Sequence, residues 1–325
     1  MSGSDHTVMA PEAELRAATR SPGMLARSIR KHHFYYWLML PGLLYLLIFK
    51  YLPMLGISIA FLEINPFIGL KGVLGGEWIG FKNFQKFFGS YFFGNIVANT
   101  FIISGLKLLF SFPTTIVLAL LINELVNVLF KRVVQTISYL PHFISWVVVA
   151  GLAFKMFSTS DGLVNQLIEW LGGERLSFLG DPRYFRSVLV ATHVWKEIGW
   201  GTIIILAALA GVNPELYESA IIDGANKLQQ IFRITLPSIA MVISILLIFN
   251  IGNLINAGFE QILLLYSPVV YDVSDIIDTY VYREGLQQLN FSYAAAVDVF
   301  KSIIALLMVV GANFTAKKLE QEGLW

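Results

Sequence analysis

A row of polar side chains interrupts one of the apolar runs of the sequence. Asn250, Asn253, Asn256 and Glu260 follow one another at intervals of three, three and four residues. At about 100° per residue, these intervals confine the four side chains to one arc about 120° wide on a helix. Amide groups can both donate hydrogen bonds to hydroxyl groups and accept them. The arc could therefore line a path for a ligand rich in hydroxyl groups, although hydrogen bonding between helices is an equally open role.

Two lysines in other apolar runs are the candidates for meeting a negatively charged substrate, Lys107 first and Lys196 next. A lysine at the centre of a membrane helix costs about 2.5–3.5 kcal/mol on insertion scales, so Lys107 should face something polar. Lys196 adjoins Glu197, which favours a structural pair. Trp195 and Trp200 flank Lys196 and could stack on a sugar ring, although packing or a place in the interfacial belt would also explain them.

Composition places these residues in a membrane protein. The chain has 325 residues, of which 56% are hydrophobic and 14% charged, and its mean hydropathy is +0.66. A net charge of +1 gives no reason to expect nucleic acid as a partner. The absence of cysteine and of an HExxH pattern among 5 histidines argues against thiol chemistry and against a metal site. We therefore expect no catalytic residues and no bound metal.

Six apolar runs are long enough to cross a bilayer, which takes about 20 residues of helix. Because hydrocarbon leaves backbone groups no other partners, helices are expected, and the predicted class is an all-α integral membrane protein. The predicted spans are 35–60, 96–122, 134–157, 187–211, 236–264 and 292–315. Asp298 and Lys301, three residues apart in the last span, are expected to neutralise one another.

Lysine and arginine predict the orientation. Basic residues lie before the first run, between the second and third, between the fourth and fifth, and after the sixth, so both termini should be cytoplasmic. We expect a cytoplasmic tail at 1–30, a membrane domain at 31–318 and a short cytoplasmic tail at 319–325. The first apolar run is too long for a signal peptide and lacks a cleavage site.

The polar loop at 213–235 predicts two short helices. Asn213 is a good N-cap and Pro214 suits the first helical position, so a helix should begin there. It should end near Gly224, which can take a positive φ without steric cost. Asp223 is expected to cap a second helix from Ala225 to about Ile234.

Leu228, Ile231 and Phe232 share one face of that second helix. A pair of amphipathic helices could simply lie on the lipid surface. It could also be a docking element for another protein.

The stretch "ESAIIDGANKLQQIFRITLP" resembles the cytoplasmic coupling motif in permease subunits of binding-protein-dependent ABC importers. The matching residues are Glu218, Ala220, Asp223, Gly224, Ala225, Leu236 and Pro237, and Ser219 departs mildly from the pattern. On this resemblance the loop, including Leu228 and Phe232, would contact an ATPase subunit.

Further stretches resemble the permeases of oligo- and polysaccharide importers, over roughly residues 34–325. They include "QTISYLPHFISWVVVAG", "VWKEIGWGTIIILAALAG" and "DIIDTYVYREGL", and the chain looks most like a permease subunit of a bacterial alginate importer. Asp298 departs from the small residue expected there.

The resemblance implies a type I ABC importer permease fold in the bacterial inner membrane. It also implies a second permease subunit, usually in a heterodimer, two ATPase subunits that bind ATP and Mg, and a periplasmic solute-binding protein. This chain lacks a GxxxxGK[ST] stretch, so the nucleotide would be bound by the ATPase subunits and no cofactor by this chain.

Two other classes stay open. A secondary carbohydrate transporter or channel would need no ATPase partner, but no internal repeat is evident. A membrane-embedded enzyme would need convergent acids or a nucleophile, and no such motif is recognisable.

Overall fold

The structure is a computed structural model that describes residues 31–65, 72 and 75–318. The chain divides into two compact units, residues 1–56 and residues 57–325. The described part is mostly helical, as predicted, with one short two-stranded sheet. The cytoplasmic tails predicted at both ends of the chain lie outside the described residues.

The first apolar run forms one continuous helical stretch. From His33 to Phe61 it is 29 residues long and apolar enough to cross a membrane, so the predicted helix at 35–60 is confirmed as a candidate span. None of the side chains between His33 and Met54 is buried within the chain. Its segments are α2 (His33–Leu46), η1 (Leu47–Tyr51), α3 (Leu52–Met54) and η2 (Leu55–Phe61).

Two short π-helical segments each end just before a proline. η1 precedes Pro53, and η5 (Ile231–Thr235) precedes Pro237. Proline has no N–H to donate, and its ring crowds the carbonyl group four residues earlier. The hydrogen bonds of the preceding turn therefore shift to the wider π pattern without ending the helix.

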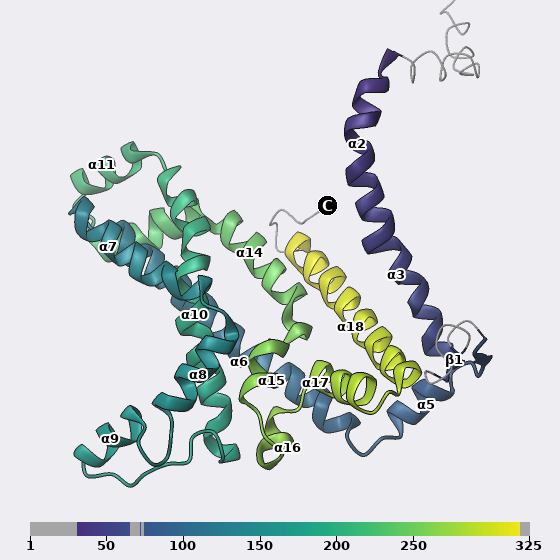
Figure 1. Cartoon of the computed structure of the whole chain (residues 1–325). Helices are drawn as coiled ribbons and strands as arrows, with labels where there is room; N and C mark the ends of the chain where they lie inside the picture. Colours follow the sequence, from purple (N-terminus) through teal and green to yellow (C-terminus); the bar gives the residue numbers. More distant parts are fainter. Residues whose placement is uncertain (1–30, 66–71, 73–74, 319–325) are drawn as a thin grey trace, which may run out of the picture. The chain divides into compact units, whose positions relative to one another are not determined.

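Three more long helices are candidate spans where spans were predicted (Figure 1). They are α6 (Phe93–Asn123), α10 (Pro182–Ala210) and α18 (Phe291–Lys318), and α6 packs along α10. Asp181 caps α10 by accepting a backbone N–H in its first turn, next to the proline that opens the helix. The predicted spans were 96–122, 187–211 and 292–315.

The span predicted at 134–157 as one helix is wrong. α7 (Val128–Tyr139) and η4 (Leu140–Phe143) form its first arm, and α8 (Trp146–Met156) leaves at an angle of 103°. Ser145 is extended and caps α8 by accepting from the backbone N–H of Val148, so the helix starts afresh there. We call this the first break.

The span predicted at 236–264 is also not one helix. α12 (Lys227–Gln230), η5 and α13 (Leu236–Ser238) run together and bend by 66° into α14 (Ala240–Gly252). A second interruption follows: η6 (Leu254–Asn256) leads into a tight turn before α15 (Phe259–Leu265). We call this interruption the second break. The described residues contain four helices that are candidate spans, or up to six candidate spans if each bent pair is counted as one.

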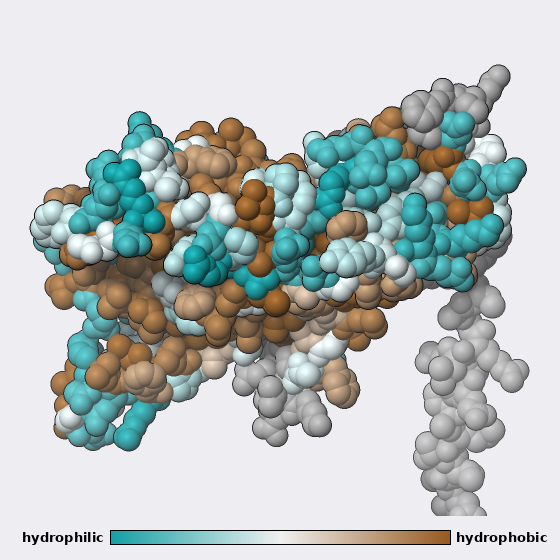
Figure 2. Space-filling view, turned by 90° about the horizontal axis from the view of Figure 1, so that it is seen from below, coloured by the Kyte–Doolittle hydropathy of each residue, from teal (hydrophilic) through white to brown (hydrophobic). Residues whose placement is uncertain are grey.

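The remaining elements of the second unit lie mostly outside the long helices. α9 and α16 lie at the end of the unit opposite α11 (Pro214–Ile222) (Figure 1). Seen from the α9 and α16 side, hydrophilic residues gather over much of the surface and hydrophobic residues lie beside them (Figure 2). The shorter elements of the second unit include a two-stranded antiparallel sheet of β1 (Leu62–Glu63) and β2 (Glu77–Trp78). The shorter helices are α5 (Lys82–Phe88), α9 (Leu163–Trp170), η7 (Pro268–Val270), α16 (Tyr271–Ser274), α17 (Ile277–Tyr282) and η8 (Arg283–Gln287).

The largest core cluster joins helices that are far apart in the sequence. Ile103 of α6, Phe185 and Leu189 of α10, and Ile262 of α15 are all at most 1% exposed and pack together. Burying side chains of this size stabilises the fold by roughly 1.5–3 kcal/mol each. This cluster fixes α15, and with it the far side of the second break, against α6 and α10.

Candidate functional site

A polar cavity of about 280 Å³ lies at the second break, between α6, α10 and the end of α14. This volume is near the lower end of the range for small-molecule pockets, about 300–1,000 Å³. The polar residues that line it are Ser104, Lys107, Ser111, His193, Asn250, Asn253 and Asn256.

The backbone turns sharply at the second break. Ala257 has φ of 22° and Gly258 has φ of 85°, a region that favours glycine. A Cβ on Gly258 would lie 2.6 Å from the Lys107 Nζ atom. The backbone conformation therefore favours glycine there, and a side chain at this position would force the Lys107 Nζ atom to move.

Lys107 stabilises this turn from the neighbouring helix. Its Nζ donates a hydrogen bond of 2.7 Å to the carbonyl oxygen of Ala257, and the residue is 4% exposed. Among the ion pairs of the described residues none includes Lys107. The cavity therefore borders a buried lysine amino group that has no carboxylate within 4 Å in the described part of the chain.

Two buried polar atoms lack a hydrogen-bond partner among the described residues, one on Ser104, which lines the cavity, and one on Gln261, which does not. They are the Ser104 hydroxyl and the Gln261 carbonyl oxygen. The other end of the Gln261 amide is held by the Leu189 carbonyl and the Thr192 hydroxyl. Because unsatisfied buried polar groups cost about 1–3 kcal/mol each, a polar guest or water would stabilise this arrangement.

The structure brings three residues of the predicted polar arc together, although not on one helix, and their role in a sugar path stays a prediction. Asn250, Asn253 and Asn256 line one cavity, but the helix that was to align them ends at Gly252. Glu260 does not line this cavity, because it lies beyond the break in the first turn of α15.

Two of the three asparagines each donate one amide hydrogen bond to a backbone carbonyl close by in the sequence. Asn250 and Asn253 donate to the carbonyl groups of Leu246 and Phe249, four residues earlier, at 2.8 and 3.0 Å. Their amide oxygens remain to accept hydrogen bonds from hydroxyl groups of a ligand.

Lys196 occupies the first break in the way that Lys107 occupies the second. Its Nζ donates to the carbonyl oxygen of His142 at 2.6 Å, and the residue is 5% exposed. Glu197 lies 3.4 Å from the same Nζ and also pairs with His142 Nδ1 at 2.8 Å, so the charge is compensated. Trp200 stacks on the His142 ring, with centroids 4.4 Å apart.

The predicted substrate residues therefore separate into groups. Lys196 and Trp200 belong to the first break, and neither lines the polar cavity. Trp195 lines a different groove between α6 and α10, together with Arg186. Of the four aromatic and basic candidates, the cavity contains Lys107 alone.

The pairing expected between Asp298 and Lys301 is wrong. Lys301 Nζ instead lies 2.5 Å from a carboxylate oxygen of Asp278 on α17. Lys301 pairs with Asp278 and not with Asp298 because α17 packs against α18 and brings the Asp278 carboxylate to the lysine.

Ser104, His193 and Gly258 were missed from the sequence. Ser104, Lys107 and Ser111 follow the i, i+3, i+7 pattern of one helix face. That spacing was a signal for a polar face on α6. No comparable signal marks His193, whose place depends on the packing of α10 against α6.

The polar loop forms the two helices that were predicted. Asn213 caps α11, and Gly224 has φ of 76°, as expected. The N–H groups of Gly224 and Ala225 return to the carbonyls of Ile221 and Ala220 at 3.0 and 2.9 Å, which is a Schellman ending.

The predicted cap of the second helix is wrong. Asp223 is the C-cap of α11, and α12 is capped by Asn226 in a capping box with Gln229. The amide side chain of Asn226 and that of Gln229 satisfy each other's backbone N–H groups, which Asp223, three residues too early, cannot do.

Apolar side chains of this loop are left exposed. Leu228, Phe232 and Ile222 are 66%, 67% and 86% exposed. Tyr217 holds α11 to η5 by a hydrogen bond of 3.0 Å to the Thr235 hydroxyl. The other residues of the predicted coupling motif lie on the same short segment: Glu218, Ser219, Ala220, Asp223, Gly224, Ala225, Leu236 and Pro237.

In the described part of the chain, no group of three His, Cys, Asp or Glu residues is placed to hold a metal ion. The expectation that this chain binds no metal or cofactor stays a prediction.

Comparison with known protein families gives one match over most of the second unit. Residues 111–321 match the family described as binding-protein-dependent transport system inner membrane component.

Two curated relatives from Bacillus subtilis (strain 168) are 46% identical. Protein LplB matches over 298 residues, 92% of this chain and 93% of the relative. The polygalacturonan/rhamnogalacturonan transport system permease protein YteP matches over 290 residues, 89% of each chain.

A solved structure is similar over nearly the whole chain. It is a chain in the crystal structure of a bacterial alginate ABC transporter in complex with an alginate pentasaccharide-bound periplasmic protein. The TM-score is 0.84 at 42% sequence identity, covering 92% of this chain and 99% of the other.

Proposed function

This chain belongs to the family of binding-protein-dependent transport system inner membrane components, and on that premise we propose that it imports an acidic oligosaccharide. It is a permease subunit of the sugar-transporting ABC type, a transport subunit with several membrane helices. In the proposed role it receives a glycan from a periplasmic binding protein, and ATPase subunits drive the glycan into the cytoplasm of a bacterium.

The observation that carries the choice of substrate is the cavity at the second break. A sugar offers many hydroxyl groups, and the cavity offers asparagine oxygens to accept hydrogen bonds from them. A uronate adds a carboxylate, which loses hydration on entering the membrane. Lys107, buried without a carboxylate of its own within 4 Å among the described residues, supplies the compensating charge.

Names of relatives point the same way. YteP is named for polygalacturonan and rhamnogalacturonan transport, and a second matching structure comes from a transporter of the acidic polysaccharide alginate. For this chain we propose an oligomer of acidic sugars, with alginate as one candidate.

The proposed ATPase contact is the α11–α12 segment. Its Schellman ending and capping box make a firm pair of helices, and Leu228 and Phe232 present apolar surface. A firm element with exposed apolar side chains suits the transmission of a movement from one subunit to another.

The proposed partners complete the transporter. They are a second permease subunit, giving a heterodimer, two ATPase subunits that hold ATP and Mg, and a periplasmic binding protein. The similar alginate transporter was crystallised in complex with such a periplasmic protein. The complex would lie in the bacterial inner membrane with its coupling segment in the cytoplasm.

Uptake by the reconstituted complex tests this function. Vesicles that hold the complex and its binding protein should take up an oligouronate in an ATP-dependent, vanadate-sensitive manner, and a neutral oligosaccharide of equal length more slowly. Uptake without ATP and insensitive to vanadate would instead support a secondary transporter.

Coupling is tested at Gly224, with Gly172 as a matched control. Both have positive φ, 76° and 84°, and a Cβ at either would have nothing within 4 Å. Valine should therefore strain both backbones by about 1–2 kcal/mol. Gly224→Val should weaken copurification of the ATPase and uncouple ATP hydrolysis from uptake, whereas Gly172→Val should do neither. Normal coupling in Gly224→Val would leave the segment as a surface helix pair on lipid.

A further inference from the structure

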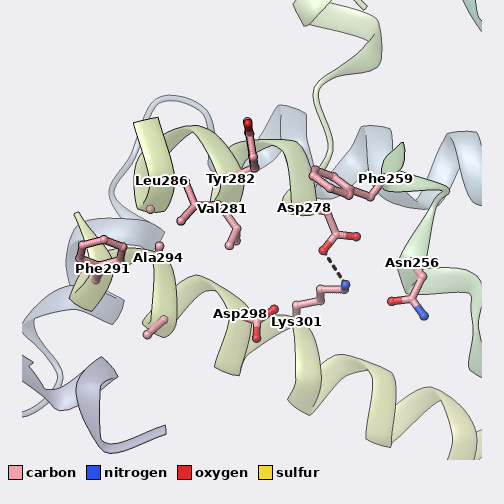
Figure 3. A pocket seen from close by; sticks show the side chains of 12 residues that line it. Asn256, Phe259, Asp278, Val281, Tyr282, Leu286, Phe291, Ala294, Asp298 and Lys301 are labelled. Atoms are coloured by element: carbon pink, nitrogen blue, oxygen red, sulfur yellow. Dashed lines mark hydrogen bonds and ion pairs between the residues drawn. The ribbon is translucent and has the colours of Figure 1, made fainter. Parts of the chain in front are cut away.

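A second hollow lies beside the polar cavity and differs from it in charge. The groove of α17, η8 and the start of α18 has a volume of about 670 Å³ (Figure 3). Most of its wall is apolar, from Phe259, Val281, Leu286 and Phe291. Asn256 lines both this groove and the polar cavity.

Three charged side chains lie in the wall of the groove: Asp278, Asp298 and Lys301 (Figure 3). Asp278 and Lys301 form an ion pair at 2.5 Å, so the charge of the lysine is already compensated by Asp278. Asp298 is exposed toward the groove and makes no ion pair within 4 Å among the described residues. The groove therefore carries one carboxylate in excess.

This carboxylate lies inside a membrane-spanning helix. α18 begins at Phe291, seven residues before Asp298. At 1.5 Å per residue, Asp298 lies about 10 Å along the helix from that end. An aspartate side chain is too short to reach the interface from there, unlike a lysine or arginine. In the assembled protein, its charge needs a partner or water.

The lining favours a basic side chain as this partner. An arginine or lysine has a long apolar stem to lie along Val281 and Leu286, and a charged end to meet Asp298. Gly285 and Ala294 are buried and pack against each other where η8 meets α18, so the wall that an incoming side chain would meet is formed by the larger apolar residues. An acidic glycan would instead be repelled by the excess carboxylate.

We propose that this groove is a docking site for the second permease subunit, which inserts a lysine or arginine beside Asp298. The inference rests on the proposed function, since that function requires a second membrane subunit. The two hollows then divide their tasks: Lys107 attracts the acidic substrate on one side of Asn256, and Asp298 holds the partner subunit on the other.

Charge variants in the full complex test the docking site. Asp298→Lys should lower the amount of copurifying second permease at least fivefold, and Asp298→Asn about twofold. The control is Asp272→Lys, which reverses an exposed carboxylate of α16 outside the groove and should change nothing. All variants should insert into the membrane in equal amounts.

A photoreactive benzophenone amino acid at position 298 identifies what lies in the groove. Capture of the second permease near a lysine or arginine, and recovery of Asp298→Lys when that residue is changed to aspartate, would support the proposal. Capture of lipid or of labelled glycan alone, or full copurification of Asp298→Lys, would overturn it. If the wild-type chain copurifies with no second permease, the proposed function fails first and this inference fails with it.

Discussion

The two broken helices of this permease are held in the same way but differ in charge. At each break, a buried lysine from another helix donates to a backbone carbonyl: Lys196 to His142, and Lys107 to Ala257. Lys196 also has Glu197 within 3.4 Å, whereas Lys107 has no such partner among the described residues. Lys196 is therefore compensated within the chain, and under the proposed function only Lys107 would have its charge available to a ligand.

Replacing Lys196 with methionine should give the largest loss of stability. It leaves the buried His142 carbonyl without its donor and removes the charge that faces Glu197, at a cost of about 1–3 kcal/mol. The thermal midpoint of the solubilised complex and its yield measure this loss. Lys155→Met, the same change at an exposed lysine of α8, should have little effect. Equal stability of the two variants would show that the first break does not depend on Lys196.

Gly258→Ala should impair transport at the second break through two effects. The positive φ of 85° costs about 1–2 kcal/mol for a residue with a Cβ, and that atom would displace the Lys107 ammonium group. Gly172→Ala is the matched control, because it has φ of 84° with open space around it. Gly258→Ala should lose more stability than Gly172→Ala, because it also disturbs the Lys107 contact, and only Gly258→Ala should lose uptake when equal amounts of complex are compared. Equal uptake in the two variants would contradict a role for the lysine's position.

Asn250→Leu, Asn253→Leu and Asn256→Leu should have the smallest effects. A flexible glycan held by several weak contacts loses about 0.5–1.5 kcal/mol with each one, which corresponds to a several-fold fall in uptake. Assembly, measured by copurification of the partner subunits, should be normal. Normal uptake in all three variants would remove the asparagines from the substrate path.

The comparison also shows how far the sequence could predict this structure. The helices around Lys107 and Lys196 were expected because long apolar runs are a local signal, and the positive φ of Gly224 followed from its place between two helices. The breaks were not expected, since membrane helices tolerate proline and glycine. The contacts that stabilise the breaks join residues far apart in the sequence: Lys107 and Ala257, which share a hydrogen bond, are 150 residues apart.

The ion pair predicted from the sequence was wrong for the same reason, because the true partner lies on another helix. Lys301 was assigned to the nearest carboxylate on its own helix, but the fold presents Asp278 from α17. The cavity was found only in part, because its asparagines were visible as a pattern while Ser104 and His193 were brought to it by packing.

The central claim is that Lys107 keeps its charge for an acidic substrate and Lys196 does not. The most direct test is the ratio of initial uptake rates for an oligouronate and a neutral oligosaccharide of equal length, in vesicles with one binding protein throughout, so that its own preference cancels between variants. Lys107→Met should lower this ratio about tenfold, equivalent to about 1.4 kcal/mol, and Lys107→Arg should largely preserve it. Lys196→Met should leave the ratio unchanged even where less complex is recovered. An unchanged ratio in Lys107→Met, or an equal fall in Lys196→Met, would contradict the account.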